Sequence, residues 1–317
     1  MHEAAQTAAD RYSDAEAEAL RQRLARVHSV PADRVVLSCG SSEILRMAAD
    51  AFLGAGRSAV IAQPTFEPIR VCAQRAGTTI VAVPLRLDYS HDLTAMLAHS
   101  DAATGLVYIC NPNNPTGTLT PRRDLEAFIR ELPETTHVLI DEAYHHYAGA
   151  SADYASFIDR PIDDNRLIVA RTFSKMYGLA GLRVGYAVAS PETARRLTAC
   201  RLADSVNVMA ACAAVAAIDD QEHVARSASR NIDDRQEFVN QAHARMLKPI
   251  DSQTNFVMMN TERQAIDVVE RFKRDGILLP TPVAGFDKHI RVSLARPAAM
   301  QAFWETWDVM NVRHSSM

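Results

Sequence analysis

Four polar clusters in the sequence contain residue types that could bind and activate a charged organic ligand. They are Gly40-Ser41-Ser42-Glu43, Asn111–Gly117, Asp141-Glu142-Ala143-Tyr144, and the stretch from Arg171 to Arg183. Each follows a short apolar run that is typical of a buried strand. Because ligands of open α/β sheets bind outside the carboxyl ends of the strands, we expect the four clusters to face one crevice.

Two of the clusters could hold a phosphate group. Gly40 allows close approach of the backbone, and the free amides at a helix start favour an anion. The hydroxyls of Ser41 and Ser42 add hydrogen-bond donors, and Arg183 could pair with the same anion through two hydrogen bonds. Taken alone, the first cluster could equally be an ordinary capped turn.

The remaining clusters offer an amide, a carboxylate and an amine. Two prolines fix the backbone of Asn111–Gly117, so one of its asparagine side chains could be aimed rigidly. Asp141 directly follows an apolar strand, where an acid is costly unless it is paired, for instance with a cationic ring nitrogen. Lys175, next to Ser174, is a candidate Schiff-base amine. Singly, these residues could also be a structural turn, a helix cap and a solvated surface charge.

Taken together, the clusters match the needs of one cofactor, pyridoxal 5'-phosphate (PLP). PLP requires an amine for its aldehyde, an anion for its ring nitrogen, and donors for its phenolate oxygen and its phosphate. The sequence supplies a candidate for each of these needs. We therefore predict a PLP enzyme in which Lys175 holds the cofactor.

The elements that carry these clusters alternate between strand-like and helix-like segments. Strands are predicted at 35–37, 58–62, 79–83, 106–110, 138–140, 167–170 and 184–189, and helices at 13–28, from about 43, and at 67–76, 91–98 and 121–131. This alternation favours an α/β domain with a largely parallel sheet.

After Pro191 the pattern changes. Residues 191–246 are mostly helical, and the rest of the chain mixes strands at 256–259, 277–279 and 290–294 with helices at 262–274 and 297–311. This mixture indicates a smaller α+β domain. We assign residues 31–231 to a large cofactor-binding domain, and residues 1–30 together with 232–317 to the small domain.

Composition excludes several classes of partner. The 317 residues carry a net charge of −4 with acids and bases interspersed, which disfavours nucleic acid and anionic membranes. No apolar run has the roughly 18 residues of a membrane helix, and the N-terminus does not resemble a signal peptide. The five scattered cysteines favour a reducing compartment, so we expect a cytoplasmic protein.

Two other kinds of site are disfavoured. No GxGxxG motif follows the first strand, which argues against a nicotinamide-binding enzyme. His145 and His146 could suggest a metal, but adjacent side chains are expected to point apart and no third ligand is apparent. We therefore expect no metal site.

The order of these motifs resembles the class I/II aminotransferases of PLP fold type I, and most closely their histidinol-phosphate aminotransferase branch. Arg11-Tyr12, Ala180–Arg183 and Arg291-Val292-Ser293 suggest that branch, and the resemblance covers roughly residues 11–310. It implies a PLP-transferase fold and a homodimer with shared active sites. It also implies exchange of an amino group between an amino acid, or histidinol phosphate, and a 2-oxo acid such as 2-oxoglutarate.

The resemblance assigns a role to each cofactor residue. Lys175 would bind the cofactor and move the proton at the substrate α-carbon, and Asp141 would pair with the ring nitrogen. Asn114 and Tyr144 would donate to the phenolate oxygen. Four residues would hold the phosphate: Ser41, Ser42, Ser174 and Arg183.

Three further roles follow from the same resemblance. Phe66 would cover the ring face, Tyr12 would reach the phosphate in the neighbouring subunit, and Arg291 would bind the substrate α-carboxylate. Without the resemblance, core packing would explain Phe66 and Tyr12, and a surface salt bridge would explain Arg291.

The sequence departs from this branch in two places. The stretch before Tyr12 lacks an Asn-Glu-Asn-Pro motif, so we expect a shortened lid. In Gly276–Pro280, Leu279 stands where we expect the arginine that binds the substrate phosphate. Since an Arg–phosphate pair contributes about 1.5–3 kcal/mol, histidinol phosphate would bind less tightly unless Arg70 or Lys288 compensates.

Other PLP chemistries remain as alternatives. A decarboxylase or a β-lyase would use the same cofactor residues and differ only on the substrate side. A PLP-binding regulator would carry an additional DNA-binding domain with basic helices, for which we find no room in the chain.

Overall fold

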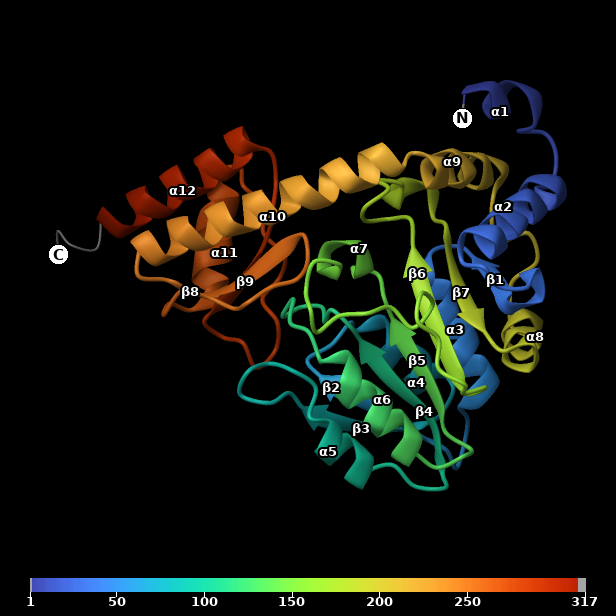
Figure 1. Ribbon diagram of the computed structural model, residues 1–317. Helices are drawn as coiled ribbons and strands as arrows, with labels where there is room; N and C mark the ends of the chain where they lie inside the picture. Colours follow the sequence, from blue (N-terminus) through green and yellow to red (C-terminus); the bar gives the residue numbers. More distant parts are fainter. Residues whose placement is uncertain (1, 313–317) are drawn as a thin grey trace.

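The computed structural model describes residues 2–312, which form a large and a small domain joined by a long helix (Figure 1). The large domain contains a seven-stranded sheet and the small domain a three-stranded one. Helix α10 (Gln221–Ala244) runs from the first to the second. The expected combination of a large α/β domain with a smaller α+β domain is confirmed.

The large sheet has the strand order β1-β7-β6-β5-β4-β2-β3. Its strands are β1 (Val35–Ser38), β2 (Ser58–Gln63), β3 (Thr79–Pro84), β4 (Thr104–Cys110), β5 (His137–Asp141), β6 (Leu167–Thr172) and β7 (Gly185–Ala189). Strands β2 to β6 are parallel, and β7 runs antiparallel to both β6 and β1. The sheet is thus mostly parallel, and the carboxyl ends of β4, β5 and β6 lie at one edge.

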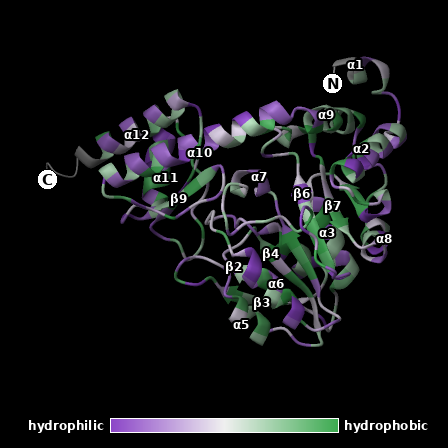
Figure 2. Cartoon of the chain, in the orientation of Figure 1, coloured by the Kyte–Doolittle hydropathy of each residue, from purple (hydrophilic) through white to green (hydrophobic). Residues whose placement is uncertain are grey.

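Helices cover both faces of this sheet, because its central strands are apolar on both sides. One face is covered by α3 (Ser41–Phe52), α4 (Pro68–Arg75) and α8 (Pro191–Ala199). The other is covered by α2 (Asp14–Val27), α5 (Leu93–Ala98), α6 (Arg122–Glu131) and α9 (Val208–Asp219). In Figure 2 the strands of the large sheet are mainly green, and the surrounding helices carry purple stretches.

The N-terminal helices pack differently from the expected domain assignment. Leu20 and Leu24 of α2 are buried in the core beneath the large sheet, and α2 lies along α9. The short helix α1 (His2–Thr7) also contacts α9. Residues 14–27 therefore pack with the large domain, whereas we had assigned residues 1–30 to the small one. An amphipathic pattern shows which face of a helix is buried but does not identify its partner.

The small domain consists of the end of α10, α11 (Ala265–Arg274), α12 (Pro297–Val312) and a sheet of order β10-β9-β8. The strands are β8 (Lys248–Pro249), β9 (Phe256–Asn260) and β10 (His289–Ser293). The prediction of a strand at 277–279 is wrong. Gly276 ends α11 in the left-handed region, and Ile277 and Leu279 pack on the core without a partner strand.

Candidate active site

A cavity of about 210 Å³ lies where β4, β5 and β6 end and α3 begins. Cys110 pairs in register with Asp141, and Asp141 with Ala170, so the strand ends bring three clusters side by side. Nearly all the predicted site residues line this cavity: Ser41, Ser42, Phe66, Asn114, Asp141, Tyr144, Ser174, Lys175 and Arg183. The sheet topology thus assembles segments that are far apart in the sequence.

One end of the cavity is built for an anion. Gly40 has φ 75° directly before α3, and a Cβ atom there would collide with the guanidinium group of Arg183. Arg183 follows the short 3-10 helix η2 (Ala180–Leu182), and its Nη1 donates to Ser174 Oγ at 3.3 Å. The start of α3, the hydroxyls of Ser41, Ser42 and Ser174, and a guanidinium therefore converge on one small volume, which suits a phosphate.

Asp141 is a buried residue of the same cavity, and each of its oxygens accepts a hydrogen bond. Tyr108 Oη donates to Oδ2 at 3.0 Å, and the backbone amide of Ala143 donates to Oδ1 at 3.1 Å. Burial raises the pKa of Asp141 to about 6, and the hydrogen bond from Tyr108 is the largest effect that opposes the rise. Among residues 2–312 no cationic side chain forms an ion pair with Asp141, so this fixed carboxylate is suited to meet a cation from a ligand.

The amine of Lys175 lies 5.2 Å from the ring centroid of Tyr144. Burial lowers the pKa of Lys175, and the positive charge of Arg291 lowers it further, while Asp141 acts in the opposite direction. The environment therefore favours the neutral amine, which is the nucleophilic form.

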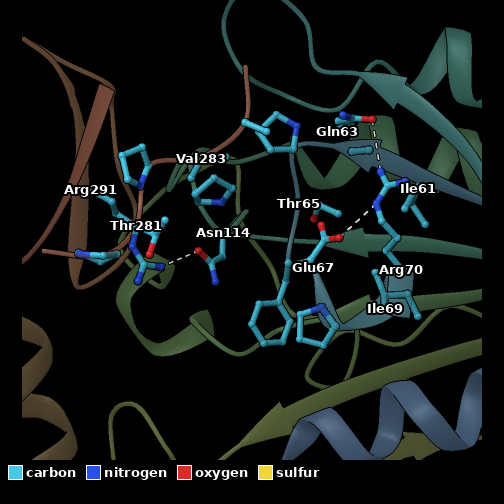
Figure 3. A pocket seen from close by; sticks show the side chains of 18 of the residues that line it. Ile61, Gln63, Thr65, Glu67, Ile69, Arg70, Asn114, Thr281, Val283 and Arg291 are labelled. Atoms are coloured by element: carbon cyan, nitrogen blue, oxygen red, sulfur yellow. Dashed lines mark hydrogen bonds and ion pairs between the residues drawn. The ribbon is translucent and has the colours of Figure 1, made fainter. Parts of the chain in front are cut away.

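A second, larger cavity of about 610 Å³ adjoins the first, since Phe66 and Asn114 line both. Figure 3 shows Arg291 of β10 on one side of it, where its Nη1 donates to Asn114 Oδ1 at 2.7 Å. Arg291 is also held against the ring of Phe256, 4.8 Å away. The partner of Arg291 is an amide and not an acid, so its charge is available to a ligand.

The far side of the larger cavity carries a second cation. Arg70 lies there beside Glu67, with 3.4 Å between Nε and Oε1, and its Nη2 donates to Gln63 at 3.3 Å (Figure 3). Leu279 packs on the small-domain core, and Lys288 is exposed and lines neither cavity. Of Arg70 and Lys288, the two candidates to replace the expected arginine, only Arg70 lines the cleft.

Tyr12 is not brought to either cavity of its own chain. Its side chain is 76% exposed, on the segment between α1 and α2. Its expected role concerns a second subunit, so this position leaves that expectation as a prediction.

The expectation that His145 and His146 point apart is wrong. Their ring centroids lie 3.7 Å apart in the short helix α7 (His145–Ala148). Burial, followed by the charge of Arg171, lowers the pKa of both imidazoles, so two neutral rings can pack together without repulsion. Within residues 2–312, no group of three potential ligands is placed to hold a metal ion.

Sequence reasoning missed two features that support the site. Glu142 and Arg171 form a buried ion pair at 3.1 Å behind the strand ends that carry Asp141 and lead to Lys175. The hydroxyl of Tyr108 on Asp141 is the other. Three signals in the sequence could have indicated them. Glu142 is a second acid after a buried strand, Arg171 is a charged residue near the end of β6, and Tyr108 is a tyrosine in an otherwise apolar strand.

Comparison with known proteins gives consistent matches along the chain. A family model described as aminotransferase class I and II matches residues 1–302. A histidinol-phosphate aminotransferase of Moorella thermoacetica is 35% identical over 305 residues, which are 95% of this chain and 79% of that protein. None of the helices within residues 2–312 has the length and apolar character that crossing a membrane requires.

Solved structures share the architecture. The histidinol-phosphate aminotransferase of Sinorhizobium meliloti, in complex with pyridoxal-5'-phosphate, has a TM-score of 0.89 and 32% identity, over 96% of this chain and 83% of that one. An L-threonine-O-3-phosphate decarboxylase of Porphyromonas gingivalis has a TM-score of 0.82 at 22% identity, over 96% of this chain and 90% of that one. The second likeness concerns the fold alone, and together they confirm the expected PLP-transferase fold.

Proposed function

The chain belongs to the class I and II aminotransferases, and we propose that it transfers the amino group of histidinol phosphate to a 2-oxo acid such as 2-oxoglutarate. It is a PLP-dependent enzyme. The observation that carries the proposal is that Lys175, Asp141 and the phosphate-binding residues line one cavity. The 35% identity to a histidinol-phosphate aminotransferase supports the choice of substrate.

The residues of the cavity fit this cofactor. PLP, when bound, supplies an electron sink for the negative charge that develops at the substrate α-carbon. Asp141 would hold a proton on the ring nitrogen, and Asn114 and Tyr144 would donate to the phenolate oxygen. Phe66 would cover a ring face. The phosphate would lie among four donors: Ser41, Ser42, Ser174 and Arg183.

Lys175 would act twice in the reaction. As a neutral amine it would bond covalently to the cofactor. Later, as a free amine, it would accept the proton from the substrate α-carbon and deliver it to C4′ of the cofactor. The lowered pKa of Lys175 supports both steps, because each begins from the unprotonated amine.

Arg291 would bind the anionic group on the substituent that an amino acid uses for its α-carboxylate. Histidinol phosphate carries a phosphate ester where an amino acid carries its carboxylate, so one guanidinium could serve both halves of the exchange. Asn114 orients Arg291, and Arg70 lines the same cleft at its far side. A substrate fixed in this way presents one α-carbon bond perpendicular to the cofactor ring, which selects the bond that breaks.

A decarboxylase or a β-lyase remains the second candidate, because the fold also supports a decarboxylase. The deciding experiment incubates the PLP-loaded enzyme with L-histidinol phosphate and 2-oxoglutarate and measures glutamate. We expect glutamate to form with the wild type and not with Lys175→Ala. Release of carbon dioxide or ammonia from amino acids, without any requirement for a 2-oxo acid, would contradict the proposal.

We further propose a homodimer in which Tyr12 completes the site of the partner subunit. The exposure of Tyr12 supports this, as does a groove beside Ser42 that is flanked by the exposed Val71 and Leu202. Light scattering would measure the mass. Mixing inactive Lys175→Ala with a Tyr12→Ala variant would restore activity if sites are shared, and would restore none if each subunit were self-sufficient.

We also propose that the enzyme acts in the cytoplasm, with small-molecule substrates as its ligands. The five free cysteines support a reducing compartment. Transamination of histidinol phosphate would place the enzyme in histidine biosynthesis.

A further inference from the structure

Tyr108 is a fully buried tyrosine, and the only polar atom of its side chain is hydrogen-bonded to Asp141, which lines the cofactor cavity. It lies in β4 two residues before Cys110, and Cys110 is in register with Asp141 on β5. Tyr108 and Cys110 therefore share one face of the sheet, and the long tyrosine side chain extends to the strand end. There its hydroxyl donates to Asp141 Oδ2 at 3.0 Å.

The ring of Tyr108 does not need this hydroxyl for packing. Its surroundings in the core are apolar, including Ile61, Leu106 and Leu139. A phenylalanine would fill the same space, whereas a buried hydroxyl is unfavourable unless it is hydrogen-bonded. The hydroxyl donates its hydrogen bond to Asp141, and the thiol of Cys110 on the same strand also interacts with it.

Asp141 depends on its two donors. It is only 1% exposed, and within residues 2–312 no lysine, arginine or histidine forms an ion pair with it. Its two oxygens are fixed separately, one by the amide of Ala143 and one by Tyr108. Two donors on opposite oxygens fix the plane of the carboxylate and favour its ionised form.

We propose that Tyr108 is a positioning residue for the transamination: its hydroxyl holds Asp141 in the orientation and the charge state that pair with the ring nitrogen of PLP. The inference rests on the proposed role of Asp141. The other titratable groups that face Asp141 are Cys110 of β4, Glu142 and Tyr144 after β5, and Lys175 after β6.

The test compares Tyr108→Phe with a matched control, Tyr186→Phe. Tyr186 is also buried, and its hydroxyl is hydrogen-bonded to His28 at 2.8 Å in the core on the other side of the sheet. The measurements are the dissociation constant of PLP from the apoenzyme and the pH profile of kcat. A hydrogen bond to a charged group is worth about one pKa unit or more, so we expect roughly tenfold weaker PLP binding in Tyr108→Phe.

The pH profile should move in one direction. Without the hydroxyl the ionised carboxylate loses a donor, the pKa of Asp141 rises, and the acid limb of kcat shifts upward by about one pH unit. Tyr186→Phe should leave both measurements unchanged. A purely structural effect of removing a hydroxyl would not move the acid limb.

A double-mutant cycle shows whether Tyr108 acts through Asp141. Asp141→Asn removes the charge, so Tyr108→Phe should then have no further effect on PLP binding. An equal effect in both backgrounds, or unchanged binding and an unchanged acid limb in Tyr108→Phe, would overturn the inference while leaving the proposed function intact. A wild-type chain that bound no PLP would overturn both.

Discussion

Replacing Arg171 by methionine should destabilise the protein strongly, because the change leaves a buried carboxylate without its cation. Arg171 and Glu142 are 3% and 1% exposed, and their ion pair measures 3.1 Å. Glu142 would keep two donors, Ser156 Oγ at 2.7 Å and Phe157 N at 2.8 Å, but no positive charge. Breaking a buried pair of this kind costs about 3–5 kcal/mol.

The assay is urea unfolding of the apoenzyme, followed by circular dichroism, with two comparison variants. Arg171→Met combined with Glu142→Gln removes both charges and should recover at least about 1 kcal/mol of the loss. Arg245→Met breaks a pair at 2.7 Å whose acid, Asp308, is 51% exposed, and should cost no more than about 1 kcal/mol. Equal costs for Arg171→Met and Arg245→Met would refute the reasoning.

Three further predictions concern the site itself. Arg291→Lys loses the bidentate contact with an anion and should lower kcat/KM about 10- to 100-fold in steady-state kinetics. An unchanged kcat/KM would exclude Arg291 from substrate binding. Gly40→Ala should weaken PLP binding by about tenfold or more, because its Cβ would collide with the Arg183 guanidinium. The control Gly56→Ala also has a positive φ but open space around its Cβ, so it should leave PLP binding unchanged. Arg291→Met removes a positive charge that lowers the pKa of Lys175, so this pKa should rise. The rate of PLP binding to the apoenzyme should then reach its plateau at higher pH, and a shift of this pH profile to lower pH would contradict the reasoning.

The position of the candidate site could be predicted from the sequence because parallel strands place their carboxyl ends at one edge. Asp141 and Lys175 were identified as polar residues that follow apolar runs, and the topology then brought them together. The large and small domains were also recognisable, since the alternation of strands and helices ends near Pro191.

Features that depend on which elements pack together could not be predicted. The pattern of α2 shows a buried face, but only the fold shows that Leu20 and Leu24 contact the large sheet. Ile277 and Leu279 alternate as in a strand and find no partner strand. The hydrogen bond from Tyr108 to Asp141 joins adjacent strands and depends on their register. Local patterns do not contain this information.

The most direct test of the central claim is an absorbance spectrum of the purified protein with PLP, before and after addition of L-histidinol phosphate. The account predicts a band near the visible edge that is absent in Lys175→Ala, and its conversion to the band of the aminated cofactor when the donor is added. A wild-type protein that forms no such band would contradict the assignment of Lys175 and of the cofactor site. A band that forms but does not respond to histidinol phosphate, while another donor converts it, would contradict the proposed substrate.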